Sequence, residues 1–352
     1  MGCVNVTFVT IMRRKPRPGD QVAVVSPSNG NPSRFPYVHE LGLDRLRDEL
    51  GLVPVEYPGT RVGASPEARA ADLHAAFADP EIAAIMATIG GDDQITVLRH
   101  LDADVIRANP KPFFGYSDNT NLLAWLHYHG VPAYYGGSTM VHLGRPVSTH
   151  PQTMASLRAA LFASGWTDLE PATGWTDEEG DWADPASLSV ERDLYPGDGW
   201  IWHNADRIVE GPTWGGCVEI IPWLLQVGHW VHPNEAYEGG VLLLESSEEM
   251  PSAQQIYRDL RNMGERGLLA RFAAVVVARP KAWSHSRRTT PAEKQEYAQQ
   301  QRQAILDVLA TYNPRAMVVL NVDFGHTDPQ LIIPYGAPIR LDGPSGTIAV
   351  HY

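Results

Sequence analysis

The sequence predicts an α/β protein of two domains, each built on a β-sheet that helices cover. Its 352 residues, 43% of them hydrophobic, are enough for two domains of ordinary size. Strand-like and helix-like stretches alternate, which is typical of βαβ units on a mostly parallel sheet. The alternation stops at residues 165–205 and then returns. We therefore expect an N-terminal Rossmann-like or flavodoxin-like domain with a parallel sheet, and a C-terminal α/β domain with a smaller mixed sheet.

The N-terminal domain is placed at residues 16–164. Its expected strands are compact apolar or β-branched runs that stop at turn residues, and its expected helices carry apolar residues at helical spacing. The strands are expected at 21–26, 83–89 and 112–115, and the helices at 37–50, 67–78, 92–101 and 120–129. Ligands bind at the carboxyl ends of strands in such a sheet, where Ser26, Gly90, Gly91 and Ser117 all fall.

The C-terminal domain is placed at residues 206–352. Its strands are expected at 241–245, 273–278 and 316–322, and its helices at 252–264 and 291–311.

Residues 165–205, here called the tryptophan-rich segment, link the two domains. The segment has little periodicity and contains Trp166, Trp175, Trp182, Trp200 and Trp202. A long segment without secondary structure is often a functional lid. An ordered surface insertion whose tryptophans simply pack is an equally good interpretation.

Composition disfavours several classes of partner. A net charge of −13 disfavours a nucleic acid polymer, because such binding rests on the neutralisation of phosphates. No run of about 20 apolar residues occurs, so neither a membrane-spanning helix nor a membrane partner is expected. The two cysteines, Cys3 and Cys217, support neither a disulfide framework nor a cysteine zinc site. A cytoplasmic location is the expectation.

Residues 1–15 are interpreted as a loose leader. Their basic residues follow the apolar stretch, which is the wrong order for a secretory signal. Met12 is an alternative start of the chain.

The motif Gly115-Tyr116-Ser117-Asp118 lies between an apolar run and a predicted helix. A serine on a sharp strand-to-helix turn holds its hydroxyl where it can attack an electrophile, and the next backbone N–H points into the same space. An ordinary helix cap is the alternative. The motif predicts Ser117 as a nucleophile.

A serine nucleophile needs a base and a group that orients the base. His326 is the best candidate base, because it follows an apolar strand and Gly325 allows close approach. Glu245 is the candidate acid, since it ends the apolar run 241–244 and a carboxylate there needs a partner. For either residue taken singly, a hydrogen-bonded structural role is the alternative.

Five motifs are spaced along the chain. They are Gly90-Gly91, Gly115-Tyr116-Ser117-Asp118, Gly215-Gly216, Leu242-Leu243-Leu244-Glu245 and Phe324-Gly325-His326. Together they resemble the LD-carboxypeptidase family of serine peptidases, especially its microcin C immunity branch, the MccF-like proteins. The resemblance covers about residues 17–345.

The resemblance implies a Ser-His-Glu triad at the interface of the two domains. Ser117 would be the nucleophile, His326 the proton shuttle and Glu245 the group that orients the imidazole. The backbone N–H groups of Gly91 and Asp118 would hold the oxyanion. The resemblance also implies that no metal or organic cofactor is required and that the protein is a homodimer.

The resemblance leaves two substrate classes open. LD-carboxypeptidases remove a terminal D-amino acid from murein peptides, whereas MccF-like members cut the bond between an aminoacyl group and a nucleotide. The expected partner is therefore a small peptide or an aminoacyl-nucleotide conjugate. The tryptophan-rich segment resembles the MccF-like lid, in which a tryptophan stacks on the nucleobase, and Trp182 is the candidate. Packing is the alternative role for Trp182.

Two positions depart from members that recognise an acidic aminoacyl group. Such members place Asn after the paired glycines, where this chain has Cys217. They carry a lysine shortly after the triad glutamate, where this chain reads Ser246-Ser247-Glu248-Glu249. Added negative charge disfavours an aspartyl group, so a neutral or basic aminoacyl group is expected. The alternative is that Glu248 and Glu249 cap the next helix.

Six residues are the candidate substrate contacts: Gly90, Trp182, Gly216, Cys217, Glu248 and Glu249. Three functions compete. The first is a serine hydrolase that detoxifies aminoacyl-nucleotide conjugates, the second an LD-carboxypeptidase of cell-wall recycling, and the third a catalytically silent protein that sequesters its ligand.

Overall fold

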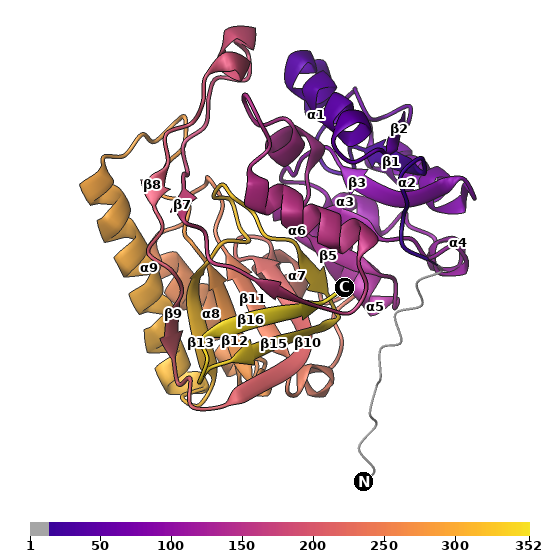
Figure 1. Ribbon diagram of the computed structural model, residues 1–352. Coiled ribbons are helices and arrows are strands. Elements are labelled where there is room, and N and C mark those ends of the chain that lie inside the picture. Colours follow the sequence, from indigo (N-terminus) through magenta and orange to yellow (C-terminus); the bar gives the residue numbers. More distant parts are fainter. Residues whose placement is uncertain (1–13) are drawn as a thin grey trace.

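The structure is a computed structural model that describes residues 14–352, in which an N-terminal and a C-terminal α/β part pack against each other (Figure 1). Most of the predicted leader, residues 1–13, lies outside the described residues. Its last residue, Lys15, is anchored, because its Nζ donates to Tyr134 Oη and to the Ala160 carbonyl, each at 2.7 Å.

The N-terminal sheet has six strands in the order β14-β5-β4-β3-β1-β2. They are β1 (Gln21–Val25), β2 (Val53–Glu56), β3 (Ile82–Ala87), β4 (Phe113–Gly115), β5 (Ala133–Tyr135) and β14 (Ile333–Tyr335). Strands β1 to β5 are parallel and follow the flavodoxin-like order 2-1-3-4-5, which confirms the prediction. Strand β14 comes from the C-terminal part of the chain and pairs antiparallel with β5.

Helices surround this sheet. They are α1 (Pro36–Asp48), α2 (Pro66–Ala78), α3 (Ile95–Leu98), α4 (Ala103–Ala108), α5 (Thr120–Tyr128) and α6 (Pro151–Phe162), with short turns η1 (Asn31–Ser33), η2 (Ser117–Asn119) and η3 (Thr139–Leu143). The helix expected at 92–101 is reduced to the single turn α3. Residues before it have other partners: Asp93 pairs with Arg69 at 2.8 Å, and the Gln94 N–H donates to the Asp118 carboxylate at 3.0 Å.

The C-terminal sheet is mixed, as predicted, with strand order β6-β16-β15-β10-β11-β12-β13-β9. Its strands are β6 (Trp166–Leu169), β9 (Ile201–His203), β10 (Ile208–Cys217), β11 (Val241–Glu245), β12 (Ala274–Ala278), β13 (Met317–Val322), β15 (Pro338–Asp342) and β16 (Thr347–His351). The expectation of a smaller sheet is wrong, because this sheet has eight strands against six. The additional strands β6, β9 and β15 alternate or are half-exposed, so they lack the continuous apolar runs of β11 to β13.

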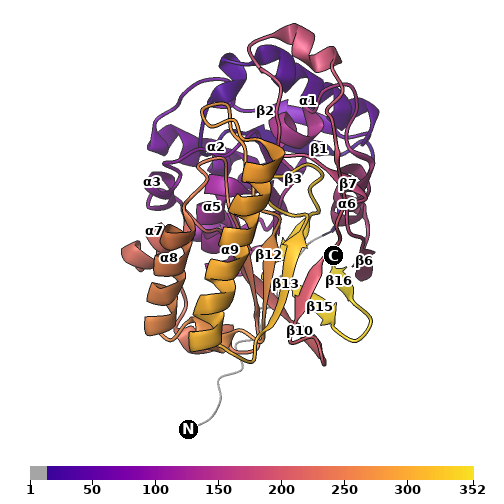
Figure 2. The ribbon, with the colours of Figure 1, turned by 90° about the vertical axis from the view of Figure 1, so that its left-hand side faces the viewer.

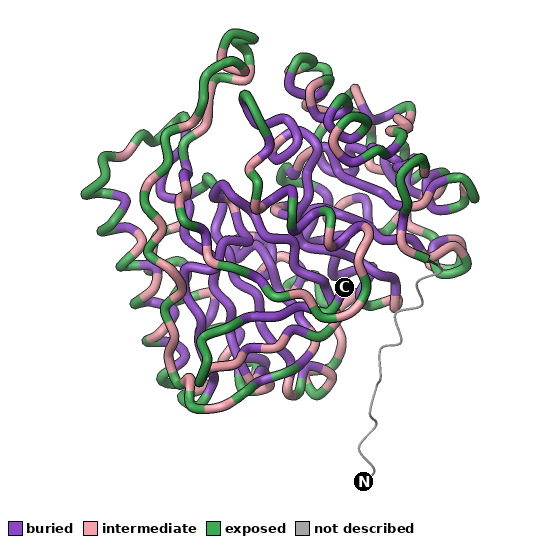
Figure 3. Tube along the Cα trace, in the orientation of Figure 1, coloured by how far each residue is buried: buried purple, intermediate pink, exposed green. Residues whose placement is uncertain are grey.

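Helices α7 (Ile221–Val227), α8 (Ala253–Glu265) and α9 (Pro291–Tyr312) belong to the C-terminal part, with the short turns η5 (Asn234–Tyr237) and η6 (Leu269–Arg271). Figure 2 shows α8 and α9 side by side on one face of the sheet. Helix α9 begins with a capping box in which Thr290 and Glu293 satisfy each other's backbone N–H groups. Buried residues of both sheets form one continuous hydrophobic core (Figure 3), so the two parts are held together by apolar packing.

The tryptophan-rich segment contains more regular structure than its sequence indicates. Besides β6 and β9 it forms a two-stranded ribbon of β7 (Gly174–Trp175) and β8 (Tyr195–Pro196), and the turn η4 (Pro185–Ser189). The turn η4 reaches α1 of the N-terminal part (Figure 1). There the Val147 N–H donates to the Leu188 carbonyl at 2.9 Å, so the segment bridges the two parts.

Within residues 14–352, no helix has the length and apolar character that crossing a membrane requires.

Candidate active site

Ser117 lies on the sharp turn between β4 and α5. Its φ is +64°, a left-handed value that a non-glycine residue adopts only when its surroundings impose it. The next residue, Asp118, anchors the turn, because its buried carboxylate accepts hydrogen bonds from Ser28 Oγ, the Gln94 N–H and Asn121 Nδ2. The turn therefore has the geometry that the sequence motif predicts.

The glycine strand end after β3 packs directly on this turn. A Cβ atom on Gly90 would lie 2.8 Å from Ser117 Cβ, 2.9 Å from Ser117 Oγ and 3.3 Å from the Asp118 nitrogen. Only a residue without a side chain leaves the space beside Oγ open. The N–H groups of Gly91 and Asp118 remain the predicted oxyanion donors.

Glu245 and His326 lie at the carboxyl ends of β11 and β13 and contact each other. His326 Nδ1 is 2.6 Å from Glu245 Oε2, and both side chains are buried. A Cβ atom on Gly325 would lie 2.9 Å from Glu245 Cβ, so the glycine permits this close approach. Glu245 can therefore fix the tautomer and the orientation of the imidazole.

The charge around His326 favours its protonated form. Burial lowers the pKa of His326, but the charge and hydrogen bond of Glu245, with smaller contributions from Glu248 and Glu219, raise it to about 9. Glu248 Oε2 is 3.5 Å from His326 Nε2, the nitrogen that does not contact Glu245.

Replacing Glu248 by glutamine is expected to lower the pH at which activity appears. A general base must be neutral, so activity should rise through the pKa of His326, and removing one of the charges that raise this pKa moves the rise to lower pH. The effect is expected to be small, because the Glu248 side chain is 59% exposed. The pH profile of kcat/KM measures it, with Glu249→Gln as a matched control; an unchanged midpoint would contradict the expectation.

Ser117 and His326 line one cavity of about 580 Å³. The Tyr116 and His326 rings are 4.8 Å apart, so the residue before Ser117 packs on the candidate base. Other predicted site residues that line the cavity are Gly90, Gly91, Trp182, Glu248 and Glu249. Trp182 contacts Phe35 edge-on, with ring centroids 5.6 Å apart.

Gly216 and Cys217 lie outside the residues that line this cavity. In the sheet, Cys217 is the register partner of Glu245, and its Sγ faces Glu219 Oε2 at 3.1 Å. Burial and the charge of Glu219 raise the pKa of Cys217, so the thiol stays protonated. Their position beside Glu245 suits support of the site better than the direct substrate contact that the sequence suggested.

Sequence reasoning missed several polar residues around the site. Tyr135, the last residue of β5, donates a hydrogen bond to Glu245 Oε1 and accepts one from the Ser117 N–H at 3.4 Å. Glu219 accepts from the N–H and Oγ of Ser247, at 2.9 and 2.7 Å, and thus shapes the loop that carries Glu248. The position of Tyr135 at a strand end was the available signal.

A charged pair in the cavity wall and a histidine packed on Tyr116 were also missed. Lys281 Nζ and Glu179 Oε1 are 2.5 Å apart and link the loop after β12 to the tryptophan-rich segment. His142 is buried 5.2 Å from the Tyr116 ring, and burial lowers its pKa to about 4, so it is neutral. A neutral His142 adds no positive charge beside His326.

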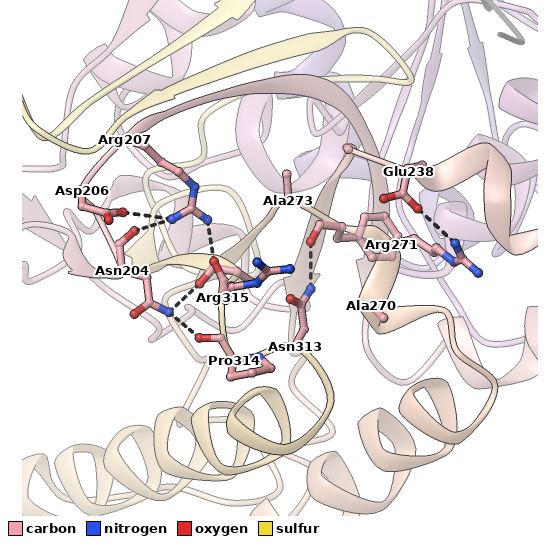
Figure 4. Close-up of a pocket in the computed structure, with 13 residues that line it drawn as sticks. Asn204, Asp206, Arg207, Glu238, Ala270, Arg271, Ala273, Asn313, Pro314 and Arg315 are labelled. Carbon is pink, nitrogen blue, oxygen red and sulfur yellow. Dashed lines mark hydrogen bonds and ion pairs between the residues drawn. The ribbon is translucent and has the colours of Figure 1, made fainter. Parts of the chain in front are cut away.

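A second cavity of about 570 Å³ lies at the opposite, amino ends of β12 and β13 (Figure 4). Two of its arginines are paired internally, Arg207 with Asp206 at 3.0 Å and Arg271 with Glu238 at 3.2 Å. Its lining contains no serine, cysteine or histidine. We therefore place the chemistry in the cavity that contains Ser117.

Residues 14–352 contain no cluster of three or more His, Cys, Asp or Glu side chains placed to hold a metal ion.

Comparisons with known proteins cover nearly the whole chain. Residues 22–136 match the family model of the LD-carboxypeptidase N-terminal domain, and residues 210–341 match the model of the C-terminal domain. A probable murein peptide carboxypeptidase of Bacillus subtilis is 25% identical over 95% of this chain and 92% of its own length. The microcin C7 self-immunity protein MccF of Escherichia coli is 25% identical over 80% of this chain and 77% of its own.

Solved structures give the same result for the fold. Wild-type MccF without ligand superposes with a TM-score of 0.82 at 22% identity, over 97% of this chain and 98% of MccF. An MccF-like protein of Streptococcus pneumoniae in complex with AMP superposes with a TM-score of 0.82 at 26% identity, over 94% and 98%. Both domain models and the two-domain fold agree, and the chain therefore belongs to the LD-carboxypeptidase family of serine peptidases.

Proposed function

We propose that this serine peptidase hydrolyses the amide bond of an aminoacyl-nucleotide conjugate of the microcin C type, with Ser117, His326 and Glu245 as its triad. One observation carries the proposal. A serine at a strained turn and a histidine bonded to a buried glutamate line the same cavity. This combination provides a nucleophile, a base and an orienting group within one space.

The reaction follows from these positions. Ser117 Oγ attacks the amide carbonyl while His326 Nε2 takes the hydroxyl proton, and the N–H groups of Gly91 and Asp118 stabilise the oxyanion. The tetrahedral intermediate collapses when His326 returns the proton to the leaving amine. Water, deprotonated by His326, then hydrolyses the acyl-enzyme, which frees the acid and Ser117. Glu245, hydrogen-bonded to Nδ1 of His326, stabilises the imidazolium that forms in both halves of the reaction.

Trp182 supports a nucleotide as the leaving part of the substrate. It lies in the cavity wall near the turn η4, with Phe35 against it. Solved relatives have been obtained with AMP, and MccF also with aspartyl sulfamoyl adenosine. Stacking of a base on an aromatic side chain contributes about 1–3 kcal/mol, enough to select a nucleotide-like substrate.

The cavity charge supports a neutral or basic aminoacyl group. Asp92, Glu248 and Glu249 line the cavity, whereas Lys281 is already paired with Glu179. One MccF structure is an active-site mutant in which a serine, an asparagine and a lysine are replaced by alanine. By the family resemblance, this chain has Cys217 where that asparagine would stand and Ser246-Ser247-Glu248-Glu249 where that lysine would stand. Because Glu248 and Glu249 line the cavity, we infer that this chain disfavours an acidic group.

A substrate panel tests the proposal. Aspartyl, alanyl and lysyl sulfamoyl adenosines and a murein tetrapeptide are compared by kcat/KM for the wild type and Trp182→Ala. We expect alanyl and lysyl compounds to be cleaved faster than aspartyl, and Trp182→Ala to raise KM for all three by about tenfold, because stacking is lost. Trp182→Phe, which keeps an aromatic face, is the control. Fastest cleavage of the aspartyl compound would contradict the charge argument.

The second candidate function is a murein LD-carboxypeptidase, favoured by the similarity to the Bacillus subtilis protein over 95% of the chain. Cleavage of the tetrapeptide alone, with no effect of Trp182→Ala, would establish this function in place of the first. The homodimer and the cytoplasmic location stay predictions from the sequence.

A further inference from the structure

Gly216, the second of the paired glycines, makes room for a side chain of the other sheet. Gly216 has a φ of +128°, and a Cβ atom there would lie 2.6 Å from Cε2 of Tyr135 and 2.7 Å from Thr120 Oγ1. Tyr135 ends β5 of the N-terminal sheet, whereas Gly216 lies in β10 of the C-terminal sheet. Because Gly216 has no side chain, the Tyr135 ring can extend from the N-terminal sheet to the C-terminal sheet.

The Tyr135 hydroxyl contacts candidate triad residues from both domains. It donates to Glu245 Oε1, and it accepts the N–H of Ser117 at 3.4 Å. The other carboxylate oxygen of Glu245 is the one that contacts His326. A phenol has one donor and acceptor lone pairs, so a single hydroxyl can make both contacts.

Tyr135 is buried and keeps its hydroxyl proton, as a hydrogen-bond donor to Glu245 must. Its side chain is fully buried. Burial and the charge of Glu245 raise the pKa of Tyr135 well above its usual value, so the hydroxyl keeps its proton and acts as a donor. A buried donor of this kind is costly to leave unpaired, which keeps it on Glu245.

We propose that Tyr135 is a positioning residue that ties the nucleophile turn of one sheet to the orienting carboxylate of the other. The inference rests on the proposed triad. Tyr135 sets the position of Ser117 through the backbone and that of His326 through Glu245. Its hydrogen bond also weakens the interaction of Glu245 with the imidazolium of His326. A carboxylate that loses such a donor becomes a stronger base and holds the imidazolium proton more tightly.

The test uses a fluorophosphonate probe, which reacts with an activated serine whatever the natural substrate is. Its labelling rate is measured against pH for the wild type, Tyr135→Phe and Tyr134→Phe. Tyr134 is the matched control, because it is buried on the same strand but its hydroxyl accepts from Lys15 at 2.7 Å, away from the site.

Tyr135→Phe is expected to slow labelling by about 10- to 100-fold, the effect of one lost hydrogen bond to a charged group. Its labelling should also begin at higher pH than in the wild type, while Tyr134→Phe changes neither property. A structural role alone would lower stability without moving the pH profile. Unchanged labelling in Tyr135→Phe, or equal changes in both variants, would overturn the proposal.

A second variant keeps the test decisive if Tyr135→Phe does not fold. Replacement of Tyr135 by 3-fluorotyrosine preserves the ring and makes the hydroxyl a stronger donor, so labelling should begin at lower pH. A shift to higher pH, or none, would contradict the proposal. If the wild type is labelled no faster than Ser117→Ala, the triad itself fails, and the role of Tyr135 fails with it.

Discussion

Ser117→Ala is expected to lower kcat by about 10⁶-fold on whichever substrate of the panel is cleaved best. Triad residues act as a unit, so loss of the nucleophile removes the whole covalent route and leaves only binding and oxyanion stabilisation. The fold should be retained, because the turn is held by the hydrogen bonds of Asp118 and not by the serine hydroxyl. Single-turnover kinetics and mass spectrometry of the acyl-enzyme measure the effect.

The control for this variant is Ser286→Ala, which removes another serine from the lining of the same cavity. Ser286→Ala should keep the acyl-enzyme and the wild-type rate. If Ser117→Ala binds the substrate as tightly as the wild type and protects cells against it equally well, the protein acts by sequestering its ligand. That result would end the enzymatic interpretation of this site.

Glu245→Gln is expected to lower kcat by about 10⁴-fold, the cost of the equivalent change in a serine-protease triad. The glutamine amide can present an N–H to Nδ1 of His326, which favours the tautomer whose Nε2 cannot accept the serine proton. The wild-type carboxylate contacts that Nδ1 at 2.6 Å, so the neutral replacement reverses one specific hydrogen bond. Steady-state kinetics on the best substrate give the loss.

The same variant should move the pH profile in a defined direction. Glu245 provides the largest contribution that raises the pKa of His326, which lies at about 9. Without that charge, burial dominates and the pKa falls, so the residual activity should begin at lower pH than in the wild type. Glu249→Gln removes a carboxylate from the cavity lining without touching the imidazole contact and is the control. A wild-type profile in Glu245→Gln would exclude Glu245 as the orienting group.

The parts of the fold that the sequence predicts well are those with strong local patterns. The run at 241–245 coincides with β11, and the helix expected at 291–311 is α9, which extends one residue further to Tyr312. Continuous apolar runs and capping residues act within a few residues of chain, so they can be recognised without the fold. The edge strands β6 and β9 of the C-terminal sheet are short and partly exposed, and their pairing partners decide whether they form.

Some residues of the candidate site can likewise be recognised from the sequence, and others cannot. Ser117, Glu245 and His326 were recognised because each follows an apolar strand, where side chains of a parallel sheet gather. Tyr135 and Glu219 were not, because their importance comes from contacts with residues far away in the sequence. Trp182 was singled out, and the structure places it in the cavity wall.

The α/β class, the order of the main strands and helices, and the three residues proposed for the chemistry can all be predicted from the sequence. Three features become visible only in the folded protein. Strand β14 extends the N-terminal sheet at β5, the tryptophan-rich segment bridges the two parts, and Gly216 leaves space for Tyr135 to reach Glu245. The physical reason is how far apart in the sequence the interacting residues lie. Local pattern specifies how a segment pairs its own backbone and which side it buries, whereas partners between segments are chosen by packing of the whole chain.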